Sequence, residues 1–150
     1  MKIYADTSFL ASLYIATDAR HGDALAIYQT WTQPPRLPLT PFGILELRNV
    51  FSRLQYKGAM HMGDARLCEQ HIKLDLKDGI LEACPLHAYQ WIHTAHDLVD
   101  KITPLTGTRT LDVLHLAIAR LNGAKTLLSF DKNQRLAAKA AGFALMPSVI

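Results

Sequence analysis

Hydrophobic residues alternate along the chain between short apolar runs and longer segments with helical spacing. The short runs are typical of buried strands, and they cover Lys2 to Ala5, Leu37 to Thr40, Ile80 to Cys84, Thr126 to Phe130 and Phe143 to Met146. In the longer segments apolar residues recur every three or four positions, which predicts helices over Thr7 to Ile15, Asp18 to Trp31, Pro41 to Tyr56, Asp64 to Leu76, His87 to Ile102, Thr110 to Leu121 and Asn133 to Ala141. Strands that alternate with helices favour an α/β fold, an α/β/α sandwich around a central, mostly parallel sheet.

Proline and glycine set several of the expected boundaries. Pro41 suits the first turn of its helix, because its missing N–H is not needed there. Pro104 is expected to end the helix that begins at His87, and Gly79 to close the one that begins at Asp64. Thr108 and Thr110 are the residue types expected to cap the helix that follows.

The length and composition are typical of one compact domain. The chain has 150 residues, of which 49% are hydrophobic, enough for a core within a single domain over residues 1–150. No stretch approaches the roughly 20 apolar residues of a membrane span, so we expect a soluble, cytoplasmic protein without a membrane partner. The net charge of +3 is a mild basic excess that suits a polyanionic partner.

Four carboxylates stand out from the apolar pattern. Asp6 and Asp131 each follow a predicted strand, and ligands of open parallel sheets bind beyond the carboxyl ends of the strands. Asp112 lies in the first turn of a helix that is apolar on almost every side. Glu46 lies on the stripe Phe42, Glu46, Asn49 and Arg53, which borders the apolar face of its helix.

Each acid taken singly has a structural explanation as a turn former or a helix cap. If the four converge, however, their repulsion is large: two like charges ~4 Å apart repel by about 4 kcal/mol at an effective dielectric near 20. A cation is then required, and an all-oxygen carboxylate site suits Mg²⁺ or Mn²⁺. Such an ion can activate water and stabilise the charge that grows on a phosphodiester, which indicates phosphodiester hydrolysis.

The segments around these acids resemble the acidic motifs of the PIN-domain nucleases. The resembling segments are Ala5-Asp6-Thr7-Ser8-Phe9-Leu10, Leu45-Glu46-Leu47, the run from Leu111 to Ala119, and the run from Leu128 to Asn133. Their order and spacing match along nearly the whole chain. Within the family, the chain is most similar to the toxin ribonucleases of VapBC toxin–antitoxin pairs.

The resemblance implies a metal-dependent endoribonuclease that cuts RNA. It implies that Asp6, Glu46, Asp112 and Asp131 are both the catalytic residues and the ligands of Mg²⁺ or Mn²⁺, with Ser8 as a polar helper. It also implies a homodimer and a cognate antitoxin whose C-terminal segment occupies the acidic groove. Where the family sometimes has a further acid after the fourth motif, this chain has Asn133, a supporting residue without charge.

Several polar residues outside the quartet have two interpretations. Arg109 could hold a phosphate or pair with one of the acids, since a guanidinium does either. Arg53 and Asn49 are the predicted RNA contacts on the Glu46 helix. His115, one turn from Asp112, is expected to be a packed, hydrogen-bonded histidine, with a contact behind the metal ligands as the alternative. His93 and His96 are expected at the surface.

Two other functions compete with RNA cleavage. The acidic pocket could serve only to bind a basic peptide or RNA without turnover. An aspartyl-phosphate mechanism also uses an aspartate at a strand end. A phosphatase of the haloacid-dehalogenase type would carry a second aspartate two residues later, where this chain has Ser8. We therefore set that class below the other two.

Overall fold

The structure, a computed structural model, describes residues 2–86 and 89–149. Its contacts divide the chain into two compact units. The first unit joins Met1–Ser8 to Leu86–Ile150, and the second is Phe9–Pro85. The expectation of a single domain stays a prediction.

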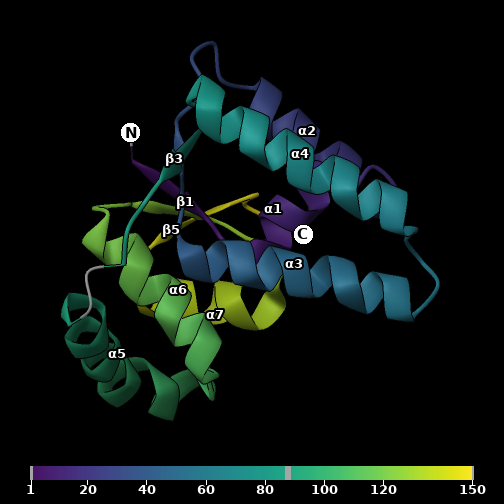
Figure 1. Cartoon of the computed structure of the whole chain (residues 1–150). Coiled ribbons are helices and arrows are strands. Elements are labelled where there is room, and N and C mark those ends of the chain that lie inside the picture. Colours follow the sequence, from purple (N-terminus) through teal and green to yellow (C-terminus); the bar gives the residue numbers. More distant parts are fainter. Residues whose placement is uncertain (1, 87–88, 150) are drawn as a thin grey trace. The chain divides into compact units, whose positions relative to one another are not determined.

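The first unit contains a three-stranded parallel sheet in the order β1-β4-β5. Ile3 pairs with Thr126, and Thr126 in turn pairs with Ala144, so the three strands run in register from the same edge. Three helices complete this unit, and they pack against one another (Figure 1). Its elements are β1 (Ile3–Ala5), α5 (Gln90–Thr106), α6 (Thr110–Leu121), β4 (Thr126–Leu128), α7 (Lys132–Ala140) and β5 (Ala144–Met146).

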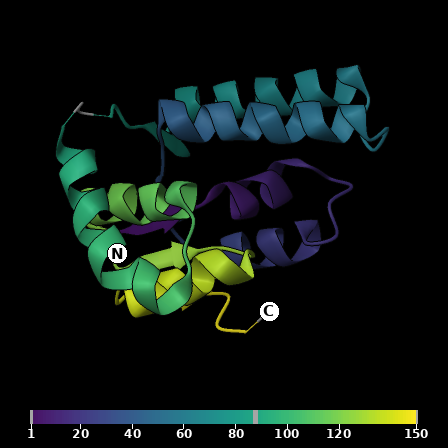
Figure 2. The same cartoon turned by 90° about the horizontal axis from the view of Figure 1, so that it is seen from below.

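The second unit is mainly helical and contains one parallel strand pair, β2-β3. Its long helices α3 and α4 run side by side, as Figure 2 shows. The boundary between the units falls inside α1. The elements here are α1 (Thr7–Tyr14), α2 (His21–Gln29), β2 (Leu37–Leu39), α3 (Pro41–Tyr56), α4 (Met62–Asp78) and β3 (Leu81–Ala83).

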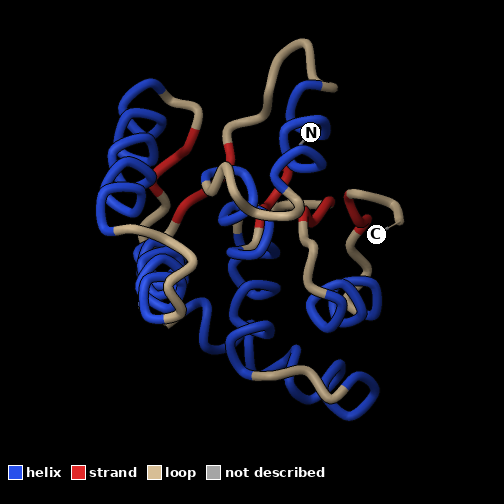
Figure 3. The backbone as a smooth tube through the Cα atoms, turned by 90° about the vertical axis from the view of Figure 1, so that its right-hand side faces the viewer, coloured by secondary structure: helices blue, strands red, loops and turns tan. Residues whose placement is uncertain are grey.

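The predicted α/β fold with parallel strands is confirmed. Figure 3 shows the short strands, in red, alternating with helices along the tube. β1 and β4 are buried along their whole length, as expected of strands that are apolar throughout. At α3 the sequence signals act as predicted: Pro41 is the first residue, and the Thr40 hydroxyl accepts a hydrogen bond from the Gly43 backbone N–H.

Several predicted boundaries differ from the structure, most by one to three residues. α5 does not end at Pro104 but continues to Thr106. Proline removes only one backbone hydrogen bond, and both it and Asp100, four residues earlier, are exposed, so water can satisfy the freed carbonyl. Gly107 ends the helix instead, with φ of 64°. β4 stops at Leu128, two residues before the expected end, and the second predicted helix is shortened to His21–Gln29.

Two further expectations concern the ends of helices. The predicted start of α5 at His87 lies outside the described residues. The residue that caps α6 is Arg109, where Thr108 and Thr110 had been expected. Thr108 is instead buried and shares a hydrogen bond with the Thr106 hydroxyl. No helix of the described residues is long and apolar enough to cross a membrane.

Candidate active site

Asp6 follows β1 directly and lies beside the end of β4. Its backbone N–H donates to the Leu128 carbonyl at 3.0 Å, which continues the strand pairing by one residue. The side chain is only 3% exposed. Two hydroxyls donate to the carboxylate, Ser8 Oγ to Oδ1 at 2.6 Å and Ser129 Oγ to Oδ2 at 2.5 Å. A buried carboxylate needs such donors, and here they also fix its orientation.

Ser8 and Ser129 link Asp6 to the loop that carries Asp131. Ser8 Oγ accepts a hydrogen bond from the Phe130 backbone N–H at 3.0 Å. Ser129 Oγ accepts one from the Asp131 backbone N–H at 3.1 Å. Each hydroxyl therefore donates to Asp6 and accepts from the loop, so the first and fourth acidic motifs form one hydrogen-bonded centre.

Ser129 is a residue that the sequence analysis did not select. The signal was present, however, because Ser129 precedes Asp131 by two positions just as Ser8 follows Asp6 by two. A serine in a run of apolar strand residues is also fully buried here. Ser8, which the analysis did select, lies where the resemblance placed it, beside the first acid.

Asp131 caps α7. Its Oδ1 accepts hydrogen bonds from the backbone N–H groups of Asn133 and Gln134, at 2.8 and 2.9 Å. The cap explanation for this acid is therefore correct, yet a cap occupies only one carboxylate oxygen. The Asn133 side chain is exposed at the same helix end.

Asp112 lies in the first turn of α6 and shares an electrostatic environment with the other two acids. Partial burial raises its pKa most, and the negative charges of Asp131 and Asp6 raise it further. A hydrogen bond with the Arg109 backbone opposes this rise. Three carboxylates from distant parts of the sequence thus come within one another's field in the first unit.

Behind these acids, α7 supplies two buried polar residues. Arg135 is 8% exposed and donates to the Ser129 carbonyl at 3.0 Å and to the Ser148 carbonyl at 3.2 Å. Burial lowers the pKa of its guanidinium, and the Asp6 charge opposes that effect. Gln134 Nε2 donates to the Asp112 carbonyl, while its Oε1 is buried without a hydrogen-bond partner among the described residues.

His115 is a packed core histidine, as predicted. It is 5% exposed, and its Nδ1 shares a hydrogen bond of 2.8 Å with the Tyr4 hydroxyl. Its Nε2 lies 3.4 Å from the Thr7 hydroxyl. His93 and His96 are exposed on α5, which also agrees with the prediction.

The remaining predicted site residues lie on two helices. Glu46, Asn49 and Arg53 lie on α3 in the second unit, where Glu46 is half-buried and the other two are exposed. The convergence of Glu46 with the three aspartates stays a prediction. Arg109 is exposed at the start of α6. The roles of Arg53, Asn49 and Arg109 in RNA binding likewise stay predictions.

The donor set has the chemistry of a magnesium or manganese site. Asp6, Asp112 and Asp131 offer only oxygens, and the orphaned Gln134 oxygen lies beside the Asp112 backbone. Within residues 2–86 and 89–149, no three histidine, cysteine, aspartate or glutamate side chains form a ready-made metal cage. Mg²⁺ commonly keeps several waters and binds through one or two carboxylates, so the residues fit an ion of this kind without a closed cage.

A comparison with protein families decides the relationship. The model of the PIN domain matches residues 3–140. The chain belongs to the PIN domain family. The resemblance to the PIN domain family that the sequence indicated is thereby confirmed. No curated protein matches the chain in sequence.

Solved structures of other proteins share this PIN fold. The Mycobacterium tuberculosis toxin VapC20, described as cleaving the sarcin–ricin loop, is 22% identical with a TM-score of 0.68, covering 95% of this chain and 96% of the toxin. FitAcB from Neisseria gonorrhoeae is 13% identical with a TM-score of 0.68, covering 97% of each chain. At these identities the likeness establishes the fold, and its extent agrees with a PIN domain that fills nearly the whole chain.

Proposed function

We propose that this PIN-family chain is an endoribonuclease that depends on Mg²⁺ or Mn²⁺ and acts as the toxin of a toxin–antitoxin pair. The observation that carries the proposal is the hydrogen-bonded centre that joins Asp6 to the Asp131 loop at the carboxyl ends of β1 and β4. Asp112, in the first turn of α6, lies within the field of both acids. Like charges brought together from three motifs are costly unless a cation accompanies them. Similarity to VapC20 supports RNA as the substrate and a toxin as the biological role.

In this proposal Asp6, Asp112 and Asp131, joined by Glu46, hold the ion. When bound, such an ion activates water and stabilises the negative charge that develops on the phosphodiester. The chain's own contribution is preorganisation. Ser8 and Ser129 fix both oxygens of Asp6, and Arg135 holds the Ser129 carbonyl. Arg109, Arg53 and Asn49 would contact the RNA backbone, while Asn133 would bind water at the site.

Cleavage of labelled RNA tests the proposal. The substrates are total RNA and an oligonucleotide of the sarcin–ricin loop, with and without added Mg²⁺ or Mn²⁺. We expect cleavage with metal only, and a loss of at least about hundredfold in Asp6→Asn and Asp112→Asn. Asp100→Asn, which changes an exposed acid on α5, is the matched control and should retain full activity.

Three results would contradict the proposal: no cleavage by folded protein with saturating metal, full activity in chelator, or full activity in Asp112→Asn. The competing function, binding of a basic peptide or RNA without turnover, is favoured by the capping role of Asp131 and the hydrogen-bonded oxygens of Asp6. RNA binding with a measurable dissociation constant but no cleavage would support that alternative.

The proposed partners are an antitoxin and a second copy of the chain. Co-expression with the protein encoded beside it should yield a complex that suppresses cleavage. Light scattering during size-exclusion chromatography should give twice the chain's 16.7 kDa mass for the isolated protein. A monomeric mass at micromolar concentration would contradict the homodimer.

A further inference from the structure

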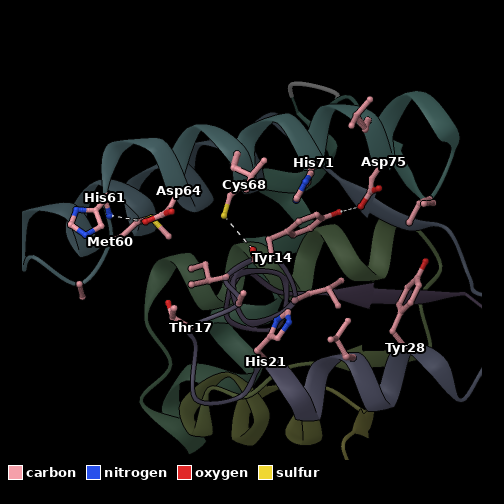
Figure 4. Close-up of a pocket in the computed structure, with 18 of the residues that line it drawn as sticks. Tyr14, Thr17, His21, Tyr28, Met60, His61, Asp64, Cys68, His71 and Asp75 are labelled. Carbon is pink, nitrogen blue, oxygen red and sulfur yellow. Dashed lines mark hydrogen bonds between the residues drawn. The ribbon is translucent and has the colours of Figure 1, made fainter.

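A pocket in the second unit lies apart from the acidic motifs in sequence. Its walls come from the end of α1, from α2 and from α4, and its volume is about 740 Å³ (Figure 4). Volumes of this size are typical of sites that bind small organic molecules. Most of the lining is apolar, with contributions from Leu13, Ile15, Leu25, Leu67, Leu74 and Ile80.

The polar residues of the pocket include a carboxylate with two tyrosines. The Tyr14 hydroxyl donates to Asp75 Oδ2 at 2.5 Å, and Figure 4 shows the two side chains pointing toward each other. Burial is the largest cause that raises the pKa of Tyr14, followed by its hydrogen bond with Asp75. Partial burial raises the pKa of Tyr28 most, and the Asp75 charge raises it further, so this second phenol lies within the field of the same carboxylate.

Two carboxylates, those of Asp64 and Asp75, line this pocket. No lysine or arginine does so among the described residues, and the other titratable side chains of the lining besides the two tyrosines and Cys68 are His21, His61 and His71. Asp64 accepts a hydrogen bond from the His61 backbone N–H at the start of α4. An apolar cavity with two carboxylates and two tyrosine rings favours a molecule that is apolar over most of its surface and positively charged at one end.

We propose that this pocket binds a small organic cation, a protonated amine with an aryl or alkyl body. The ammonium group pairs with Asp75 on the side of the pocket that Tyr14 and Tyr28 line, and the apolar body lies against the leucines of α4. The site is independent of the proposed nuclease function, because its residues all belong to the second unit and include none of the predicted acids. The unit therefore carries a ligand site beside any role it has in RNA cleavage.

Three probes with the same body and different head groups test the proposal. These are 4-phenylbutylamine, which is cationic near neutral pH, 4-phenylbutanol, which is neutral, and 5-phenylpentanoate, which is anionic. Binding is measured by calorimetry and by NMR shifts of the full chain. We expect the amine to bind most tightly and the acid least, with the amine at least about tenfold tighter than the alcohol.

Two variants locate the binding. Asp75→Asn keeps the shape of the side chain and an acceptor for the Tyr14 hydroxyl but removes the negative charge. It should therefore weaken the binding of the amine about tenfold and leave the affinity for the alcohol unchanged. Asp78→Asn, an exposed acid at the end of the same helix, is the matched control and should change neither. Circular dichroism confirms that both variants are folded.

The comparison of the three probes uses the wild-type chain alone, so its result does not depend on whether a variant folds. Equal binding of amine and alcohol would overturn the proposal, and so would the absence of amine binding at millimolar concentration. NMR shifts of the amine confined to residues outside the pocket would also overturn it. NMR shifts of the pocket residues on addition of a basic peptide, with no measurable affinity for the amine, would overturn the proposal and assign the pocket to a protein partner instead.

Discussion

Asp6 and Asp75 both accept a short hydrogen bond from a hydroxyl, yet their surroundings differ. Asp6 lies almost fully buried between two serines, and two further aspartates act on the same region. Asp75 is half-buried beside tyrosines, in a pocket whose other walls are mostly apolar. The same kind of hydrogen bond thus holds an acid of a cluster in the first unit and, in the second, a carboxylate of a mostly apolar pocket.

The difference teaches that neighbours decide what a carboxylate can bind. Hydroxyls satisfy the hydrogen-bonding capacity of Asp6 but cannot neutralise three like charges, so that region requires a cation with a high charge. A carboxylate beside aromatic rings and apolar side chains favours a bulky cation of single charge. Substitutions at the two sites should therefore change the free energy of unfolding by different amounts.

The largest expected effect on stability is that of Ser129→Ala. This change removes the hydroxyl that donates to the buried Asp6 and accepts from the Asp131 N–H, so one buried carboxylate oxygen and one part-buried N–H lose this hydrogen bond. We expect a loss of about 2–3 kcal/mol in the free energy of unfolding, measured with urea. Ser148→Ala, at an exposed position, is the control and should cost less than about 0.5 kcal/mol. Equal losses of unfolding free energy in the two variants would show that the Ser129 hydroxyl does not stabilise the acidic centre.

The corresponding change in the pocket, Tyr14→Phe, should cost less. It removes one hydrogen bond to a charged group that is only half-buried, and Asp75 can regain water. We expect a loss of about 1 kcal/mol by the same measurement. Tyr56→Phe, which alters a phenol that is 93% exposed, should have no measurable effect. A loss larger than that of Ser129→Ala would reverse the order that the two environments predict.

The smallest effect concerns pH in the absence of metal. The pKa of Asp112 in the folded chain is raised above its ordinary 3.8, so the folded state holds this proton more tightly than the unfolded state. The resulting stabilisation is present below about 3.8 and is lost as the pH rises through the raised pKa. As the pH rises toward neutral, the free energy of unfolding of the wild-type chain should fall by less than about 1 kcal/mol relative to that of Asp112→Asn. The effect is small because water screens the charge of a half-buried group.

Urea unfolding in chelator, repeated across the acidic range for both chains, measures that difference. A difference that stays constant, or that grows in favour of the wild-type chain as the pH rises, would show that burial and the charges of Asp131 and Asp6 do not raise the pKa of Asp112. Added Mn²⁺ should remove the effect, since the cation neutralises the same repulsion.

The fold class could be predicted from the sequence because several independent signals in it agree. Continuous apolar strands, helical spacing and the turn around Pro41 all agree, and α3 and α6 have the predicted bounds. Pro104 misled the prediction because its cost depends on whether water reaches the freed carbonyl, which the sequence does not reveal.

Parts of the site could also be predicted, and others could not. Asp6 and Asp131 follow strands that proved to be neighbours, so position along the chain sufficed. The roles of Ser129 and Arg135 depend on which atoms face one another across the loop after β4, and a serine or an arginine has no pattern that specifies this. The pocket escaped notice because its tyrosines and Asp75 come from segments that read as ordinary amphipathic helices.

Binding of Mn²⁺ tests the central claim most directly, because it needs no knowledge of the RNA. Electron paramagnetic resonance follows the loss of the free-ion signal as protein is added. The wild-type chain and Asp100→Asn should bind Mn²⁺ with equal affinity, and Asp112→Asn should bind at least about tenfold more weakly. Undiminished binding in Asp112→Asn, or no binding in the wild-type chain, would contradict a metal site at the three aspartates.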